Sequence, residues 1–283
     1  MLSKGALNLV RSRWRMLLGR PWLIADIALG YFLERLFCRS RNVKSFGWPQ
    51  AFLYSWRIDL WRRYACVAQQ IRSVGAENIS ILDVGGGRGT IKEFLNPDRY
   101  HLQVLDIKTE TLRRVGDARL RVVAGDGTRL PFKDNSLDVV VSLDSLEHVP
   151  DVKKDGYCRE IKRVAKRCVI IHCPADSSDG KFQGTAYDAK FLQWHRLRLN
   201  RNEPSTVEHL TCGVPKVEKL MSYFPGAICL GKQNVEVWLT YMKWCHIPYI
   251  RFIAGLLYKL LWVKKDDQPP YHACLLVWHK RQL

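Results

Sequence analysis

The sequence contains no pair of cysteines at C-x-x-C spacing, although nine cysteines occur among its 283 residues. A zinc site built on such pairs is therefore excluded, and no carboxylate and histidine cluster has metal-ligand spacing, so we predict no metal. An odd, irregularly spaced set of cysteines is typical of buried thiols in a reducing compartment, and we expect a cytoplasmic protein. The basic N-terminus also lacks a small-residue cleavage site after a short apolar core, which argues against a secretion signal.

Long apolar runs and acidic residues are both scarce. The longest apolar stretch near the N-terminus, residues 22–33, contains Asp26 and is too short to cross a bilayer. The 27 acidic residues are outnumbered by 45 basic ones, which leaves a net charge of +18. This excess lies mainly at the two ends of the chain, because residues 1–72 carry +10 and residues 235–283 carry +4. Such a distribution favours phosphate-bearing partners and leaves an anionic membrane and nucleic acid open.

Two segments combine basic residues with apolar helical faces. Residues 1–74 are expected to form a basic amphipathic helical extension in which arginines alternate with tryptophans and leucines. Residues 235–268 are expected to form a helical insertion, with apolar side chains at positions 250, 253, 254, 257, 260 and 261. Each segment either packs on the domain core or lies in a membrane interface. Their joint presence favours a peripheral membrane contact.

Between residues 75 and 283, short β-branched runs alternate with helical stretches. Seven strands are expected, with the sequences ISILDV, YHLQVLD, LRVVAG, LDVVVSL, CVIIHCP, GAICLGK and YHACLLVWH. A helix is expected to start at TIKEFLN, and the chain after Pro174 reads as polar and irregular as far as TVEHLTCGVP. The alternation predicts an α/β domain with a doubly wound, mostly parallel seven-stranded sheet of Rossmann-like type.

A glycine-rich turn follows the first of these strands. In ILDVGGGRGT the glycines of the odd positions are Gly85, Gly87 and Gly89, and Asp83 precedes them. A dinucleotide fingerprint would need a glycine at the position of Thr90. An acid beside a pyrophosphate is costly, whereas Asp83 suits a ligand that carries an ammonium group. The turn therefore favours S-adenosylmethionine over a dinucleotide.

Acidic residues at the ends of the next strands agree with a nucleoside ligand. Asp106 ends the second strand, where a carboxylate accepts ribose hydroxyls. Asp126 and Gly127 follow the third strand, where an adenine edge would lie, and Ser142 lies on the fourth. We predict that these residues, with the turn, bind the cofactor.

As an ordered set, these motifs resemble the class I S-adenosylmethionine-dependent methyltransferases. The turn LDVGGGRG, Asp106, the segment GDG…LPF and the segment DVVVSLDSLEHV are similar to the family's motifs between about residues 78 and 174. The later segment TVEHLTCGVPKVEKLMSYFPG resembles one found in bacterial members associated with glycan gene sets. The resemblance implies methyl transfer to a small-molecule, glycan, glycolipid or lipid-like acceptor.

Methyl transfer to a hydroxyl group needs a base. The predicted catalytic residues are His209, His148 and Asp144, with His195 as a further candidate base. Each histidine also has an ordinary structural explanation, as a hydrogen-bonded packing residue. Two alternative functions stay open, a nucleic-acid methyltransferase and a non-catalytic nucleotide-binding module at the membrane. Against the former, the fourth strand ends in SLDS and lacks the N/D-P-P-[YFW] motif of amino-group nucleic-acid methyltransferases.

Overall fold

The computed structural model describes residues 58–75, 78–96, 98–112, 120–247, 255 and 257–280. Most of the predicted N-terminal extension, and positions 250, 253 and 254 of the predicted insertion, lie outside these residues. Within the described part of the chain, none of the helices has the length and apolar character that a membrane crossing requires.

One seven-stranded sheet organises the described residues, in the order β3-β2-β1-β4-β5-β7-β6. Its strands are β1 (Ile79–Val84), β2 (Tyr100–Asp106), β3 (Arg121–Ala124), β4 (Leu137–Leu143), β5 (Ala165–Pro174), β6 (Ile228–Asn234) and β7 (Tyr271–His279). The first five run parallel to one another, whereas β7 is antiparallel to both neighbours, β5 and β6. The predicted fold, a mostly parallel seven-stranded sheet of the Rossmann-like methyltransferase type, is confirmed.

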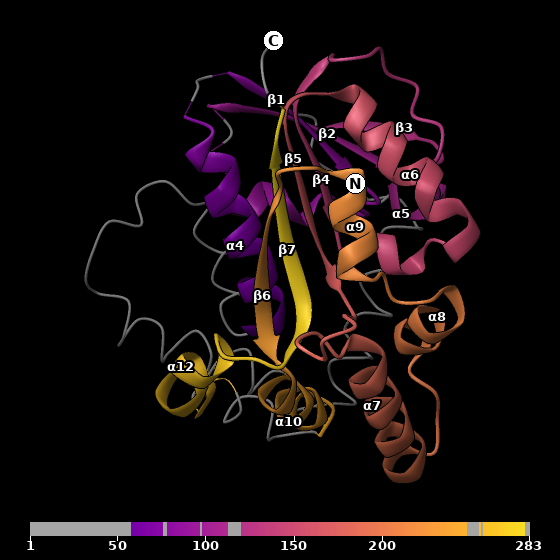
Figure 1. Ribbon diagram of the computed structural model, residues 1–283, viewed down its shortest axis with the longest axis vertical. Helices are drawn as coiled ribbons and strands as arrows, with labels where there is room; N and C mark the ends of the chain where they lie inside the picture. Colours follow the sequence, from indigo (N-terminus) through magenta and orange to yellow (C-terminus); the bar gives the residue numbers. More distant parts are fainter. Residues whose placement is uncertain are drawn as a thin grey trace, which may run out of the picture.

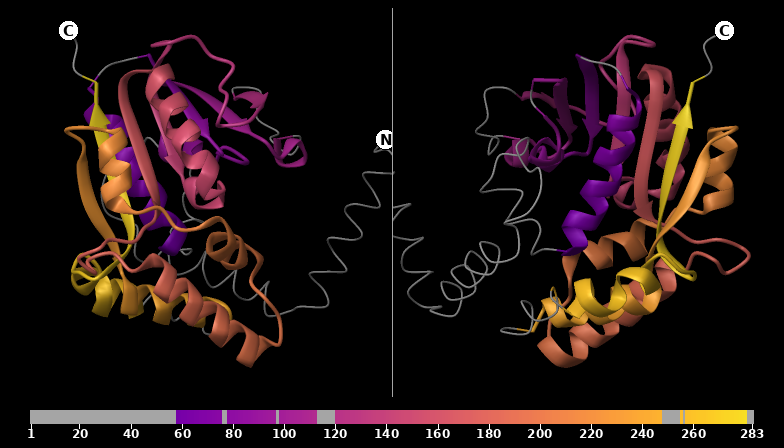
Figure 2. Two further views of the ribbon diagram at one scale, coloured as in Figure 1. Left: turned by 45° about the vertical axis from the view of Figure 1, so that its right-hand side comes forward. Right: turned by 90° about the vertical axis from the view of Figure 1, so that its left-hand side faces the viewer.

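Helices cover both faces of this sheet (Figures 1 and 2). Helix α4 (Ile58–Ser73) and the short 3-10 helix η1 (Thr90–Phe94) pack on one face, where Val67 and Ile71 are fully buried. Helices α6 (Asp151–Val164) and α9 (Val217–Tyr223) pack on the other face. The short α5 (Thr109–Leu112) follows β2. Since α4 belongs to the core, the extension predicted to end at residue 74 shares its last helix with the domain.

The remaining helices gather at the carboxyl edge of the parallel strands (Figure 1). They are α7 (Gly184–Leu199), α8 (Pro204–Cys212), α10 (Val235–Cys245), the π-helical turn η3 (Tyr258–Trp262) and α12 (Val263–Asp266). The 3-10 helix η2 (Leu146–His148) follows β4 at the same edge. Open parallel sheets bind ligands at this edge, so these helices surround the expected site.

Two local predictions were wrong. The segment after Pro174 contains the helices α7 and α8 where an irregular chain was expected. Phe191 and Leu192 of α7 are buried, and so are its polar residues Asp188 and His195. The helix expected at TIKEFLN is only the five-residue η1.

Candidate active site

The glycine turn after β1 requires glycine at particular positions. Gly85 and Gly89 have φ angles of +74° and +68°, in the left-handed region that side chains rarely adopt. A Cβ atom at Gly85 would also overlap the side chain of Ser145, and one at Gly86 would overlap the carboxylate of Asp83. The backbone of the turn therefore lies in direct contact with the side chains of Ser145 and Asp83.

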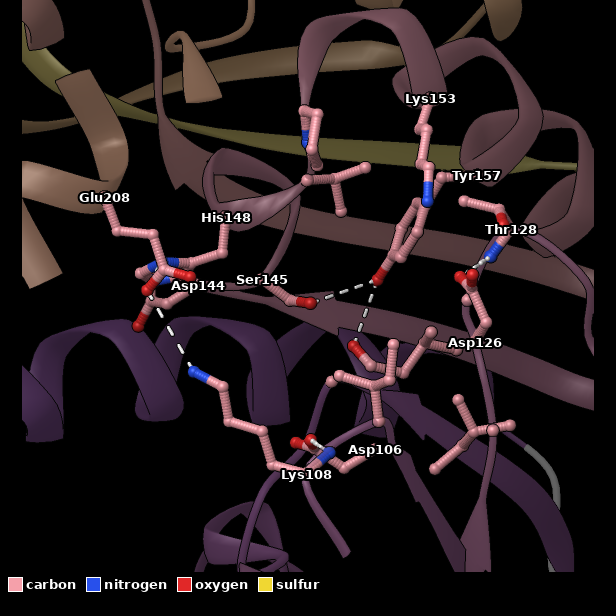
Figure 3. Close-up of a pocket in the computed structure, with 18 residues that line it drawn as sticks. Asp106, Lys108, Asp126, Thr128, Asp144, Ser145, His148, Lys153, Tyr157 and Glu208 are labelled. Carbon is pink, nitrogen blue, oxygen red and sulfur yellow. Dashed lines mark hydrogen bonds and ion pairs between the residues drawn. The ribbon is translucent and has the colours of Figure 1, made fainter. Parts of the chain in front are cut away.

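A cavity of about 340 Å³ opens beside this turn, at the carboxyl ends of β1, β2 and β4 (Figure 3). Of the residues predicted from the sequence, the following line it: Gly85, Asp106, Asp126, Gly127, Asp144 and His148. Gly87 and Gly89 shape the turn without lining the cavity. Its volume is in the range of small-ligand sites.

The two acids predicted to bind the nucleoside are held by backbone amides. Asp106 accepts hydrogen bonds from the amide of Gly87 at 3.0 Å and from that of Lys108 at 2.7 Å. Asp126 accepts one from the amide of Thr128 at 2.9 Å, and this bond is the main reason why its pKa is lowered. Both carboxylates are thus held in place at the cavity wall, as ribose and adenine recognition would require.

Asp83 lies beneath the turn and is only 1% exposed. Its Oδ1 atom has no hydrogen-bond partner among the described residues. Burial, and then the negative charges of Asp106 and Asp144, raise the pKa of Asp83 to about 7. A buried carboxyl group without a partner suits a positively charged ligand above it, which fits the ammonium and sulfonium groups of S-adenosylmethionine.

Ser142 does not line the cavity, contrary to the prediction. It is fully buried, and its hydroxyl lies 2.9 Å from the hydroxyl of Tyr157. Tyr157 does line the cavity, and it also donates to the carbonyl of Val84 at 3.1 Å and contacts Ser145 (Figure 3). The sequence analysis missed Tyr157, because one tyrosine on a helix carries no motif.

Asp144 is unsuited to act as a base. Its carboxylate contacts the guanidinium of Arg63, and its Oδ1 atom lies 2.9 Å from Nδ1 of His172. Burial alone would raise the pKa of Asp144, but Arg63 and His172 outweigh it and lower the pKa to about 2. We therefore correct its predicted catalytic role to the positioning of Arg63 and His172.

His148 is the predicted base that the structure places best. Its ring lines the cavity, and its Nδ1 atom lies 2.9 Å from the carboxylate of Glu208 on α8 (Figure 3). Burial, followed by the charge of His209, lowers the pKa of His148. The imidazole is therefore neutral near pH 7 and able to accept a proton.

His209 stands behind His148 and does not line the cavity. The two rings pack edge to face with centroids 4.7 Å apart. Nδ1 of His209 lies 2.9 Å from the carboxylate of Asp188, whose other oxygen lies 2.9 Å from Nε2 of His272. Burial lowers the pKa of His209, but the bond with Asp188 and the charge of Glu147 outweigh it, so the pKa is raised.

His195 has a structural role, against its candidacy as a base. It is 2% exposed, and its Nδ1 atom lies 2.8 Å from the carbonyl oxygen of Arg201, beyond the end of α7. It does not line the cavity beside the glycine turn.

Glu147 was also missed by the sequence analysis, although it directly precedes His148. It is 1% exposed, and burial followed by the charge of Asp144 raises its pKa to about 8. Glu147, His148 and His209 each place one ligand-type atom within 4.8 Å of the others. Only the fold brings His209 to the other two, so the sequence spacing could not indicate this group.

A second cavity, of about 610 Å³, lies between α4, β6 and the α12 region. Three arginines and one lysine line it, together with two aspartates: Arg62, Arg63, Arg72, Lys232, Asp266 and Asp267. His172 lines it too. Since Asp144 of the first cavity contacts both Arg63 and His172, the two cavities share a wall.

Sequence comparison shows which known proteins this chain is similar to. Residues 82–172 match a family model described as a methyltransferase domain. An arginine-hydroxylase from Danio rerio is 32% identical over 46% of this chain, but the match spans only 42% of that relative. A demethylmenaquinone methyltransferase from Renibacterium salmoninarum is 27% identical over 70% of this chain and 78% of its own length.

A solved structure supports the same fold. Phosphoethanolamine N-methyltransferase 2 from Haemonchus contortus, in complex with phosphomonomethylethanolamine and S-adenosylhomocysteine, superposes with a TM-score of 0.51. The superposition covers 83% of this chain and 58% of that one at 14% identity. Together with the glycine turn, its acids and the family match, these likenesses show that the chain contains a class I S-adenosylmethionine-dependent methyltransferase domain.

Proposed function

We propose that the protein transfers a methyl group from S-adenosylmethionine to an anionic, lipid-linked acceptor, such as a glycolipid, at a membrane surface. The observation that carries this proposal is the second cavity, which adjoins the cofactor cavity through the contacts of Asp144. Its lining contains more basic than acidic side chains, which favours an acceptor that bears phosphate or carboxylate groups.

The mouth of this cavity is apolar and exposed. Trp61 and Val263 line the cavity and are 42% and 46% exposed, and Leu260 and Leu261 in the adjoining turn are 70% and 64% exposed. Lys264 and Lys265 follow directly and are also exposed. Exposed leucines beside lysines are typical of surfaces that enter the headgroup region of anionic membranes. A lipid-linked acceptor could then reach the cavity while its tail stays in the bilayer.

The family comparison supports an apolar acceptor in general terms. The relative from Renibacterium salmoninarum is named as a demethylmenaquinone methyltransferase, and a relative from Gibberella zeae as a sterol 24-C-methyltransferase. The chain spans less than half of the length of the relative from Danio rerio. The activity proposed for this protein is therefore argued from the residues of its own site.

The chain's own residues supply binding, orientation and proton transfer. When bound, S-adenosylmethionine would supply a methyl group on its sulfonium sulfur, which leaves with the rest of the cofactor as a thioether. Asp106, Asp126 and the glycine turn hold the nucleoside, and Asp83 favours the charged end. His148, neutral and oriented by Glu208, accepts the proton of an acceptor hydroxyl.

A partition assay tests the proposal. Full-length protein is incubated with S-adenosylmethionine labelled in its methyl group and with a total membrane lipid extract, and the products are separated into organic and aqueous phases. We expect label in the organic phase, and its loss in His148→Ala. In parallel, the protein should sediment with phosphatidylglycerol vesicles and not with phosphatidylcholine vesicles. Changing both Leu260 and Leu261 to Glu should reduce sedimentation at least about tenfold.

A matched substitution controls for added charge. Val152 on α6 is 91% exposed, and α6 lies away from α12 (Figure 1), so Val152→Glu should leave sedimentation unchanged. Label confined to water-soluble products or to added RNA would overturn the lipid-linked acceptor. Equal binding to both kinds of vesicle, or none, would overturn the membrane surface.

A further inference from the structure

Glu147, His148 and His209 form a compact group beside the cofactor cavity, which we call the Glu–His–His cluster. Glu147 and His148 are consecutive residues of η2, and His209 comes from α8. One oxygen or nitrogen atom from each lies within 4.8 Å of the others. Only His148 reaches the cavity wall, so the cluster lies at the edge of the site and not across it.

A carboxylate lies close to each histidine, and that of Asp188 is hydrogen-bonded to His209. Nδ1 of His209 lies 2.9 Å from Asp188, and Nδ1 of His148 lies 2.9 Å from Glu208. Asp188 is itself fixed by Nε2 of His272, also at 2.9 Å. Metal-binding histidines commonly bind a carboxylate through one nitrogen, which leaves the other nitrogen for the ion. On His209 the other nitrogen, Nε2, lies 4.0 Å from a carboxylate oxygen of Glu147 and 3.3 Å from the hydroxyl of Ser205, which an ion would displace.

One carboxylate oxygen of Glu147 lies 4.0 Å from Nε2 of His209. The other, Oε2, has no hydrogen-bond partner among the residues that the structure describes, and Glu147 is only 1% exposed. Leaving a buried carboxylate oxygen without a partner is costly. A cation bound by the cluster would remove this cost. Protonation of Glu147 would remove it as well and is the alternative.

The charges around the cluster favour a cation. Four carboxylates lie in or next to it: Asp144, Glu147, Asp188 and Glu208. The cations nearby are Arg63, which contacts Asp144, and Lys108, which lies 4.0 Å from Glu208. His209 is a third, because its pKa is raised. The four carboxylates outnumber these three side chains.

We propose that the Glu–His–His cluster binds one divalent transition-metal ion. Two imidazoles and one carboxylate form a ligand set that Zn²⁺ and its neighbours in the first row accept, with a further position open to water or substrate. Binding draws the three ligand atoms together until they are about 3.3 Å apart, as metal–ligand bonds of roughly 2 Å require. The open position would take an oxygen of the acceptor.

This proposal goes beyond the proposed function, because it adds a site that methyl transfer alone does not need. A bound ion lowers the pKa of a coordinated hydroxyl group. In the metal-bound protein His148 is therefore a metal ligand. The ion, and not His148 as a base, would then promote loss of the proton from the acceptor hydroxyl. This proposal departs from the prediction from the sequence that the protein has no metal.

Metal titration tests the cluster without any acceptor. Tag-free, full-length protein is stripped with a chelator and titrated with Co²⁺, followed by calorimetry and by visible absorption. We expect saturable binding of one ion per chain with the absorption of nitrogen and oxygen ligands. His209→Ala and Glu147→Gln should weaken binding at least about 100-fold, and Asp188→Asn about 10- to 100-fold. His101→Gln, which changes an exposed histidine on β2, should bind as the wild type does.

Each other result overturns the proposal. Absence of saturable binding would leave a protonated Glu147 as the solution, and equal binding by His209→Ala would place the ion elsewhere. Absorption from thiolate ligands would assign the ion to cysteines. Titration of each variant with S-adenosylhomocysteine shows that it is folded. Because no methyl transfer is measured, failure of the lipid-linked acceptor leaves this test unaffected.

Discussion

Asp106 fixes both sides of the ligand turn with a single carboxylate. Its two oxygens accept hydrogen bonds from the amide of Gly87 in the glycine turn and from that of Lys108 after β2. The side chain is 9% exposed, so these bonds are largely shielded from water. The carboxylate thus both shapes the site and remains available to ribose hydroxyls through its other lone pairs.

Asp106→Asn should weaken cofactor binding, because an amide has only one acceptor oxygen and its NH₂ group repels one of the two backbone donors. We expect the dissociation constant of S-adenosylhomocysteine to rise at least about tenfold, or ~1.4 kcal/mol. Isothermal titration calorimetry measures it. Asp98→Asn, at an exposed turn, is the control and should bind normally. An unchanged constant for Asp106→Asn would contradict the assignment.

Asp83 should make the stability of the ligand-free protein depend on pH. Its pKa in the folded state, about 7, exceeds its ordinary value of 3.8. Between these two pH values the folded state therefore binds more protons than the unfolded state does. The free energy of unfolding therefore falls as pH rises from about 4 to about 7, by up to about 1.4 kcal/mol per pH unit. Asp83→Asn removes this contribution.

Urea unfolding at about pH 5, 6 and 7 measures the effect. The wild type should lose stability relative to Asp83→Asn across this interval, and Asp98→Asn should follow the wild type. Parallel curves for Asp83→Asn and the wild type would show that Asp83 titrates normally in the folded state.

At the scale of single elements, helix α6 links the sheet to the ligand turn. Tyr157 reaches from this helix to Ser142 on β4 and to the carbonyl of Val84 at the end of β1. Its ring also packs beneath Gly127, where a Cβ atom would overlap it. The helix therefore sets the spacing between the ends of three strands.

Tyr157→Phe keeps the ring but leaves the hydroxyl of Ser142 and the carbonyl of Val84 without this partner. We expect a loss of about 1–3 kcal/mol in the free energy of unfolding, measured by urea denaturation. Tyr223→Phe is the matched control, since its hydroxyl contacts Asp155, which is 50% exposed. That change should stay within about 0.5 kcal/mol. Equal losses in the two variants would contradict a special role for Tyr157.

The strands could be predicted from the sequence better than the helices at the carboxyl edge. Buried parallel strands are short β-branched runs, and Ile79–Val84 shows this pattern directly. Helix α7 shows little periodicity, because it is buried on several sides by α8, α10 and the sheet edge. Its packing depends on distant segments, which local patterns do not report.

Some residues of the site could likewise be predicted from the sequence, and others could not. Gly85, Asp106 and Asp126 could be predicted because they follow strand ends in a fixed order. Tyr157 and Glu208 could not, because their roles arise only where α6 and α8 meet the sheet edge.

At the scale of the whole molecule, two cavities of different character share one wall. The cofactor cavity contains the glycine turn and its acids, while the second cavity is lined largely by basic side chains. The Arg63–Asp144–His172 contacts lie between them. A ligand that displaces Arg63 would leave Asp144 with one cationic partner fewer, so binding on one side must be energetically coupled to the other.

The antiparallel strand β7 has a consequence for how the protein is made. It lies between β5 and β6, so an interior position of the sheet is filled by the strand that leaves the ribosome after the other six. Until residue 279 emerges, the edges of β5 and β6 that pair with it stay open to other chains. The nascent polypeptide is therefore exposed to mispairing from the completion of β5 at residue 174 until β7 has emerged, and a stop codon upstream of β7 would yield a product with an incomplete sheet.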